Sequence, residues 1–214
     1  MIVCQNLSKK FGDHFALREI SFSGEGKIGV FGYNGAGKST LAKIIAGILK
    51  PSSGKIEVFG LEPSKSPELR RKIGVVTHNP MLYRELTVME NLEFYAKLYN
   101  SEDWRVVVKK LRLNEILNHR ISELSRGFTQ RVAIARALIC DPKILILDEA
   151  FSGLDVESRE ILVRIIQEFN GLLVFSTHNF EDAEFCDSFL VLENGRLKYF
   201  GDSYEKAIES LSTH

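Results

Sequence analysis

The sequence predicts an α/β fold, with a mainly parallel sheet covered by helices, a small antiparallel β layer and an inserted helical subdomain. Short apolar runs alternate with helical patterns, which is the order typical of a parallel sheet covered on both faces. The central strands are expected at residues 27–31, 73–77, 143–147 and 172–176. Two more, at 188–192 and 196–200, flank Glu193-Asn194-Gly195, a hairpin turn signal.

Two further segments complete this architecture. Residues 2–22, with a turn at Gly12-Asp13, and residues 54–59 form the expected antiparallel layer. The stretch 79–140 lacks a strand pattern, and helical spacing recurs in it at 88–99, 104–111 and 129–139. We therefore expect a single domain over residues 1–214, in which a helical subdomain (79–140) is inserted into an α/β core (1–78 and 141–214).

The composition is that of an ordinary soluble globular chain, with 44% hydrophobic and 26% charged residues. Lys plus Arg (28) equals Asp plus Glu (28), so no overall charge favours nucleic acid, and no nucleic-acid partner is expected. Cys4, Cys140 and Cys186 show neither metal-ligand nor redox spacing, which indicates buried thiols in a reducing compartment. No signal-peptide pattern or bilayer-length apolar run is present, so a cytoplasmic location is expected.

A phosphate-binding loop follows the strand at 27–31 and leads into a helix. Glycines at this spacing let successive backbone N–H groups converge on a polyphosphate, and the helix N-terminus favours anions. Lys38 is expected to reach the outer phosphates and the Ser39 hydroxyl to meet Mg²⁺. The nucleotide-binding residues predicted here are Gly32, Asn34, Gly35, Ala36, Gly37, Lys38, Ser39 and Thr40. This loop predicts a P-loop NTPase core that binds a nucleoside triphosphate, the alternative being a plain glycine-rich turn.

The helix after this loop is expected to carry its apolar side at helical spacing. The positions that define this side are Leu41, Ile44, Ile45 and Ile48.

Acidic and imidazole side chains follow the next two strands of the predicted sheet. Asp148 and Glu149 end the apolar run 143–147, and a buried strand delivers its last residues to the ligand-binding edge of an open α/β sheet. Asp148 is predicted to hold Mg²⁺ through a water, and Glu149 to align and deprotonate the water that attacks the γ-phosphate. His178 is predicted to hydrogen-bond the γ-phosphate and that water. The alternatives are two solvent-facing carboxylates and a structural histidine.

A second phosphate-facing helix start is predicted at Ser125. Ser125 is a good N-cap, and Gly127 lets the backbone approach a phosphate there. Because the chain's own loop already cradles one nucleotide, this second site makes most sense if it serves the nucleotide of another subunit.

These elements, in this order, resemble the ATP-binding cassette (ABC) ATPases over nearly the whole chain. Residues 124–131 look like the family's Leu-Ser-Gly-Gly-Gln signature, 152–155 like its D-loop, and His178 like its switch histidine. On the same ground Asp155 and Phe11 are assigned to the nucleotide site, with Phe11 stacking on adenine, although a phenylalanine beside a glycine turn is more often core. The resemblance implies a Mg²⁺-dependent ATPase that closes as a head-to-tail dimer. Each ATP would then lie between one subunit's loop and the other's Ser125 and Gly127.

The chain departs from the family pattern at His78, where a glutamine usually contacts Mg²⁺ and the attacking water. Mg²⁺ prefers hard oxygen ligands, which argues against direct imidazole coordination. Three interpretations stay open: a catalytic His78 acts through a bridging water, Asn79 supplies the amide oxygen, or the contact is absent. Arg126 and Phe128 also replace signature residues, with little expected loss because the phosphate contacts fall on Ser125 and Gly127.

The resemblance implies an ATP-hydrolysing transporter subunit at the inner face of the cell membrane, paired with a separate transmembrane permease. The permease groove would involve residues 79–99, whose aromatics are Tyr83, Phe94, Tyr95 and Tyr99; the alternative places most of them in the helical core. Residues 82–99 look most like exporter cassettes, including haem-exporter and multidrug-type subunits. Two other functions remain: a soluble ABC ATPase of translation or DNA repair, and a nucleotide-gated interaction module without turnover.

Overall fold

A six-stranded sheet forms the centre of the protein and confirms the predicted α/β fold. The computed structural model describes residues 1–212, so residues 213 and 214 of the predicted domain lie outside the described residues. The strand order is β5-β6-β7-β3-β8-β9, and every neighbouring pair is parallel except the β8–β9 hairpin. The strands are β3 (Lys27–Phe31), β5 (Ile73–Val76), β6 (Ile144–Asp148), β7 (Leu172–Ser176), β8 (Ser188–Glu193) and β9 (Arg196–Gly201).

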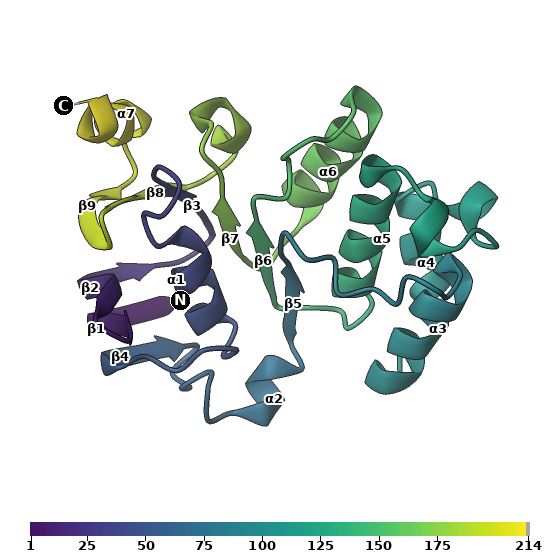
Figure 1. The fold of residues 1–214 in the computed structure, drawn as a ribbon, viewed down its shortest axis with the longest axis horizontal. Coiled ribbons are helices and arrows are strands. Elements are labelled where there is room, and N and C mark those ends of the chain that lie inside the picture. The colour runs from purple at the N-terminus through teal and green to yellow at the C-terminus, as the bar shows by residue number, and fades with distance from the viewer. Residues whose placement is uncertain (213–214) are drawn as a thin grey trace.

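The predicted antiparallel layer is a separate three-stranded sheet with the order β2-β1-β4. Its strands are β1 (Ile2–Phe11), β2 (His14–Gly24) and β4 (Ser53–Val58). Gly12, with φ 56°, makes the tight turn between β1 and β2. Figure 1 shows this layer beside α1 at one end of the molecule, with α3, α4 and α5 gathered at the other end.

The central sheet separates two hydrophobic clusters, because successive side chains of a strand point to opposite faces. On β6, Leu145 and Leu147 belong to the cluster under α3–α6, whereas Ile144 and Ile146 belong to the cluster under α1 and the antiparallel layer. Burial on both faces explains why these strands read as unbroken apolar runs.

The helices are α1 (Lys38–Ile45), α2 (Pro67–Arg70), α3 (Val88–Tyr99), α4 (Trp104–Lys110), α5 (Arg126–Leu138), α6 (Val156–Glu168) and α7 (Tyr204–Ser212). Three 3₁₀ turns complete the set: η1 (Asn114–Ile116), η2 (Ile121–Glu123) and η3 (Phe180–Ala183). Residues 79–140 are mainly helical, as predicted, and an isolated bridge joins Thr87 to Arg120 within them.

One helix boundary differs from the prediction and another agrees with it. Helix α1 ends at Ile45, and Gly47 takes φ 72°, so Ile48 lies beyond the helix and is 51% exposed instead of buried. Helix α5 begins at Arg126, as the predicted N-cap Ser125 requires, and Ser125 accepts a hydrogen bond from the Phe128 N–H.

The three cysteines are free, and Cys4 and Cys186 are buried, as expected. Burial raises the pKa of the Cys4 thiol to about 12 and that of Cys140 to about 11. These thiols therefore stay protonated at neutral pH and act as small apolar side chains. Among the described residues, none of the helices combines the length and apolar character needed to cross a bilayer.

Candidate nucleotide-binding site

The phosphate loop lies where β3 ends and α1 begins, as predicted. Its glycines are required at two close contacts: a Cβ on Gly32 would lie 2.4 Å from the Leu192 carbonyl oxygen, and one on Gly37 would lie 2.6 Å from that of Ala16. Gly32 and Gly37 also take φ of 149° and 108°. The loop residues from Asn34 to Thr40 line one cavity together with Ala16 and Glu149.

Lys38 is buried at the start of α1, and its ammonium group lies among oxygen atoms. Its Nζ donates to the carbonyl oxygens of Gly32 at 2.7 Å and Tyr33 at 3.3 Å. The same Nζ lies 3.5 Å from Oε1 of Glu149. The structure thus brings together the predicted phosphate-binding lysine and the predicted base, which are far apart in the sequence.

The two predicted magnesium ligands also meet. The Ser39 hydroxyl donates to Asp148 Oδ1 at 3.1 Å, and the Ser176 hydroxyl donates to the same oxygen at 2.6 Å. Asp148 is 4% exposed at the end of β6. A hydroxyl beside a carboxylate at a phosphate loop is the hard-oxygen donor set that suits Mg²⁺, which takes its other ligands from phosphates and water.

Glu149 and His178 line a common cavity of about 230 Å³, to which Ser152 and Gly153 also contribute. Glu149 has φ 53°, and its N–H donates to the backbone oxygen of Ser176 at 3.0 Å and to the hydroxyl at 3.1 Å. The next strand therefore fixes the direction of Glu149. The side chain of Glu149 is 29% exposed, so a water molecule can reach it.

His78 is exposed just beyond β5, which pairs with β6, so it lies at the same sheet edge as Asp148. The side-chain oxygen of Asn79 accepts a hydrogen bond from the Met81 N–H at 3.0 Å. This bond uses one of the two acceptor positions of the amide oxygen, so the three interpretations of His78 and Asn79 stay open.

Phe11 is 48% exposed at the end of β1, so the core interpretation of this residue is wrong. Lys9 Nζ lies 5.0 Å from the centre of its ring. The exposed ring can stack on a base, and its contact with adenine stays a prediction.

Around the second helix start, Gly127 and Asp155 lie against one another. A Cβ on Gly127 would lie 2.1 Å from Asp155 Oδ2 and 2.7 Å from the Ser158 hydroxyl. Gly127 is therefore needed for α5 to approach the start of α6, whatever its role toward a phosphate. Ser125, by contrast, is exposed.

Asp155 caps α6: it accepts hydrogen bonds from the Ser158 N–H at 2.8 Å and from the Ser158 hydroxyl at 2.9 Å. These bonds, the backbone one first, hold the pKa of the Asp155 carboxyl below its usual value, and nearby Arg131 adds to the effect. Sequence reasoning missed Arg131, which is buried, donates to the Ser158 hydroxyl at 2.9 Å and pairs with Glu157 at 3.1 Å. An arginine inside an otherwise apolar helical pattern was the available signal.

Gly127→Ala should lower the urea midpoint of unfolding. Alanine favours a helix by about 1 kcal/mol over glycine. Overpacking against Asp155 and Ser158, which are both held by hydrogen bonds, costs about 1–3 kcal/mol of stability. This cost should exceed the gain in helix propensity. A raised midpoint would show that the contact relaxes freely and that the higher helix propensity of alanine determines the stability of the variant.

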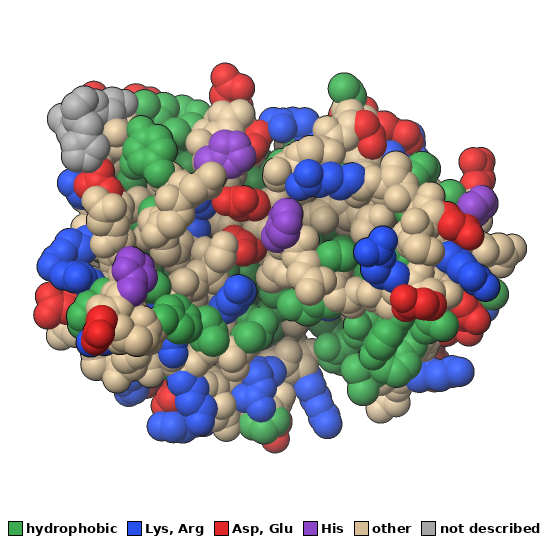
Figure 2. Space-filling view, viewed as in Figure 1, with side chains coloured by type: hydrophobic (Ala, Val, Ile, Leu, Met, Phe, Trp, Pro, Cys, Tyr) green, Lys and Arg blue, Asp and Glu red, His purple; other side chains and the backbone are tan. Residues whose placement is uncertain are grey.

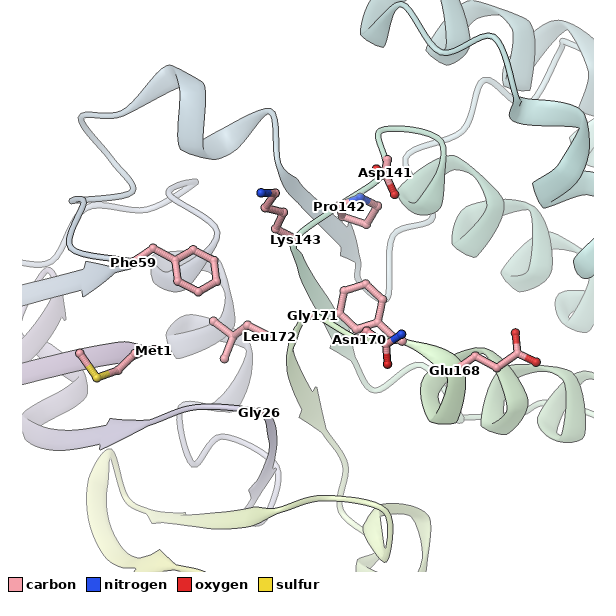
Figure 3. Close-up of a pocket in the computed structure, with 11 residues that line it drawn as sticks. Met1, Gly26, Phe59, Asp141, Pro142, Lys143, Glu168, Asn170, Gly171 and Leu172 are labelled. Atoms are coloured by element: carbon pink, nitrogen blue, oxygen red, sulfur yellow. The ribbon is translucent and has the colours of Figure 1, made fainter.

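Another cavity lies at the opposite edge of the sheet and is not part of this site. It measures about 710 Å³ and includes Lys143 and Leu172, at the entry to β6 and β7. Figure 3 shows Met1 and Phe59 on one side of it and Asn170 and Glu168 on the other. Asp148 lies at the far end of β6.

The chain matches the family model described as "ABC transporter" over residues 18–152. It belongs to the ATP-binding cassette family of ABC transporters, as the motif order indicated, and is an ATP-binding subunit with ATPase activity. It is 35% identical to the ABC transporter ATP-binding protein NatA of Bacillus subtilis, over 99% of this chain and 91% of NatA.

Other relatives carry both import and export names. The chain is 35% identical to a probable sulfate/thiosulfate import ATP-binding protein CysA of Chlorella vulgaris, over 95% of this chain and 92% of that protein. It is 39% identical to a Nod factor export ATP-binding protein I of Rhizobium etli, over 89% of this chain and 65% of that protein.

Solved structures of cassettes share the fold. An ATP-binding subunit of an ABC transporter aligns with a TM-score of 0.86 and 30% identity, over 100% of this chain and 95% of that one. The cassette MJ0796, a dimer bound to ADP and Pi, aligns with a TM-score of 0.82 and 28% identity, over 94% of this chain and 98% of MJ0796. The cassette cbiO1 from Clostridium perfringens, part of the complex cbiONQ, aligns with a TM-score of 0.81 and 28% identity, over 97% of this chain and 90% of cbiO1.

Proposed function

We propose that two cassettes close head to tail on two Mg-ATP molecules and that hydrolysis reopens them to drive a separate membrane permease. Lys38, Ser39, Asp148, Glu149 and His178 meet at one sheet edge, which supports hydrolysis there. The observation that carries the composite site is the exposed, Ser125-capped start of α5, a second helix N-terminus suited to an anion in addition to the phosphate loop of the same chain. The similar cassette MJ0796, which is dimeric and bound to ADP and Pi, supports a dimer of cassettes with bound nucleotide.

The residues divide the work of hydrolysis. The loop N–H groups and Lys38 would hold the phosphates, and Ser39 and Asp148 would hold Mg²⁺, which would neutralise charge that develops on the phosphates. Glu149 takes the proton of the attacking water, and His178 orients that water against the γ-phosphate. His78, which stands in place of the glutamine that the family carries, would act on a bound Mg²⁺ through a bridging water.

Mixing two inactive variants tests the composite site. Lys38→Ala removes the loop cation, and Ser125→Glu places a negative charge where the partner's phosphate should lie. In a mixed dimer, one pocket combines the intact loop of one chain with the intact Ser125 of the other. Random pairing should therefore restore about a quarter of the wild-type turnover. Additive, near-zero turnover in the mixture would mean that each nucleotide is served by one chain.

An apolar surface on the helical part suits the proposed permease. Met81, Tyr83, Phe94 and Leu98 are 38%, 48%, 44% and 61% exposed, and the Tyr83 and Phe94 rings meet edge to face at 5.3 Å. Figure 2 shows hydrophobic side chains gathered over the region of α3. Tyr95 and Tyr99 instead pack against the core, so the core alternative is correct for these two.

The Tyr83 backbone is held in place by Asn91, which is fully buried. The side chain of Asn91 accepts from the Tyr83 N–H at 2.8 Å and donates to the Tyr83 carbonyl oxygen at 3.0 Å. A preformed apolar surface of this kind is suited to a permease segment at the inner face of the membrane. Affinity capture from detergent extracts tests this partner: a polytopic membrane protein supports it, whereas ribosomes or DNA favour the non-transport alternative.

Export is the proposed direction, on the resemblance of residues 82–99 to exporter cassettes. The relatives include a probable sulfate/thiosulfate importer protein as well as a Nod factor export protein, so overall similarity does not select a direction. Transport into or out of sealed vesicles, with the captured permease present, decides it.

A further inference from the structure

The backbone on both sides of His178 is clamped by buried polar groups. The Thr177 hydroxyl donates to Asp182 Oδ2 at 3.0 Å and accepts from the Asn179 N–H at 3.1 Å. Thr177 and Asp182 are 3% and 8% exposed, whereas His178 is exposed. The direction of the imidazole is therefore set by this clamp more than by packing around the ring.

Asp182 is in turn held by Arg159, on the first turn of α6. The Arg159 guanidinium donates to Asp182 Oδ1, and its centre lies 5.0 Å from the centre of the Phe151 ring. The Arg159 backbone N–H donates to the Asp155 carbonyl oxygen at 3.0 Å. The position of the clamp is thus tied to residues 151–155, which begin two residues after Glu149.

A third contact anchors the same segment to the phosphate loop. Phe180 stacks on Phe31 with ring centres 4.1 Å apart and planes 10° apart, and Phe31 is the residue before Gly32. Arg159, Asp182, His178 and Glu149 all line one cavity. The segment of His178 is therefore braced against β3, which leads into the phosphate loop, and against the start of α6.

We propose that Arg159 and Asp182 are positioning residues, which hold His178 at its place opposite Glu149 and transmit the position of residues 151–155 to it. The inference rests on the proposed role of His178. A displacement of about 1 Å in a group that orients a reactant costs on the order of a hundredfold in rate. Because neither residue belongs to the phosphate loop, nucleotide affinity should be spared.

Arg159→Met should lower kcat for ATP hydrolysis about 10- to 100-fold and change KM for ATP less than about twofold. Arg159→Lys keeps a cation that can reach Asp182 and should retain more turnover than Arg159→Met. Arg164→Met removes an exposed arginine from the same helix and should behave as wild type. Binding of a fluorescent ATP analogue to each variant reports folding, and a loss of turnover shared equally by the lysine and methionine variants would overturn the proposal.

A double-variant cycle separates positioning from general destabilisation. If Arg159 acts through His178, Arg159→Met should cause no further loss of kcat once His178→Ala is present. An equal loss in both backgrounds would contradict the proposal. If His178→Ala leaves kcat unchanged, the proposed role of His178 fails, and the inference with it. If His178→Ala lowers kcat but Arg159→Met does not, the inference alone fails.

Discussion

Glu149→Gln is expected to lower ATP turnover by at least about a hundredfold while ATP binding is retained. Glutamine keeps the shape of the side chain but cannot take a proton from the attacking water. Glu149 is suited to that task, since its backbone is fixed by Ser176 and its carboxylate is 29% exposed, 3.5 Å from Lys38 Nζ. Phosphate release under saturating Mg-ATP, with binding of a labelled ATP analogue, measures both quantities.

Glu160→Gln is the matched control, because Glu160 is an exposed glutamate on α6, away from the site. Its turnover should equal that of the wild type. Should Glu149→Gln also turn over at the wild-type rate, Glu149 is not the base. Its presence would then give no argument against the alternative of an interaction module without turnover.

Lys38→Ala is expected to weaken ATP binding about 10- to 100-fold. The ammonium group is buried and lies between the loop carbonyl groups and Glu149, where a polyphosphate gains a charge-assisted contact. A hydrogen bond to a charged group contributes about 1.5–3 kcal/mol, and each 1.4 kcal/mol corresponds to a tenfold change in affinity. Titration with ATP under equilibrium conditions gives the ratio of the dissociation constants of Lys38→Ala and the wild type.

Lys43→Ala provides the comparison, since Lys43 lies on the exposed side of the same helix and carries the same charge. Its affinity should match the wild type. Equal weakening in both variants would assign the effect to the overall field of α1 and would remove Lys38 from direct contact with phosphate. Together with Glu149→Gln, this pair separates binding from chemistry.

The central strands could be predicted because burial on both faces makes each of them read as a short apolar run. The phosphate loop could be predicted because its glycines and Lys38 are neighbours in sequence. Helix α1 was extended too far, to Ile48, because the apolar spacing continues where the left-handed Gly47 ends the helix. Periodicity does not detect such a turn.

The contacts between elements could not be predicted. Ser176 binding Asp148, Gly127 under Asp155 and the pair of Arg159 with Asp182 each join segments 20 or more residues apart. They depend on the strand order and on how closely α5 approaches α6, neither of which a motif specifies. Asp155 illustrates the result: its motif suggested a nucleotide contact, which stays a prediction, and did not indicate that its carboxylate caps α6.

A structure of the Glu149→Gln protein with Mg-ATP tests the composite site most directly. The account predicts a dimer in which the Ser125 hydroxyl and the Gly127 N–H of one copy contact the γ-phosphate held by the Lys38 of the other. A nucleotide bound by a single protomer, with Ser125 facing solvent, would contradict it.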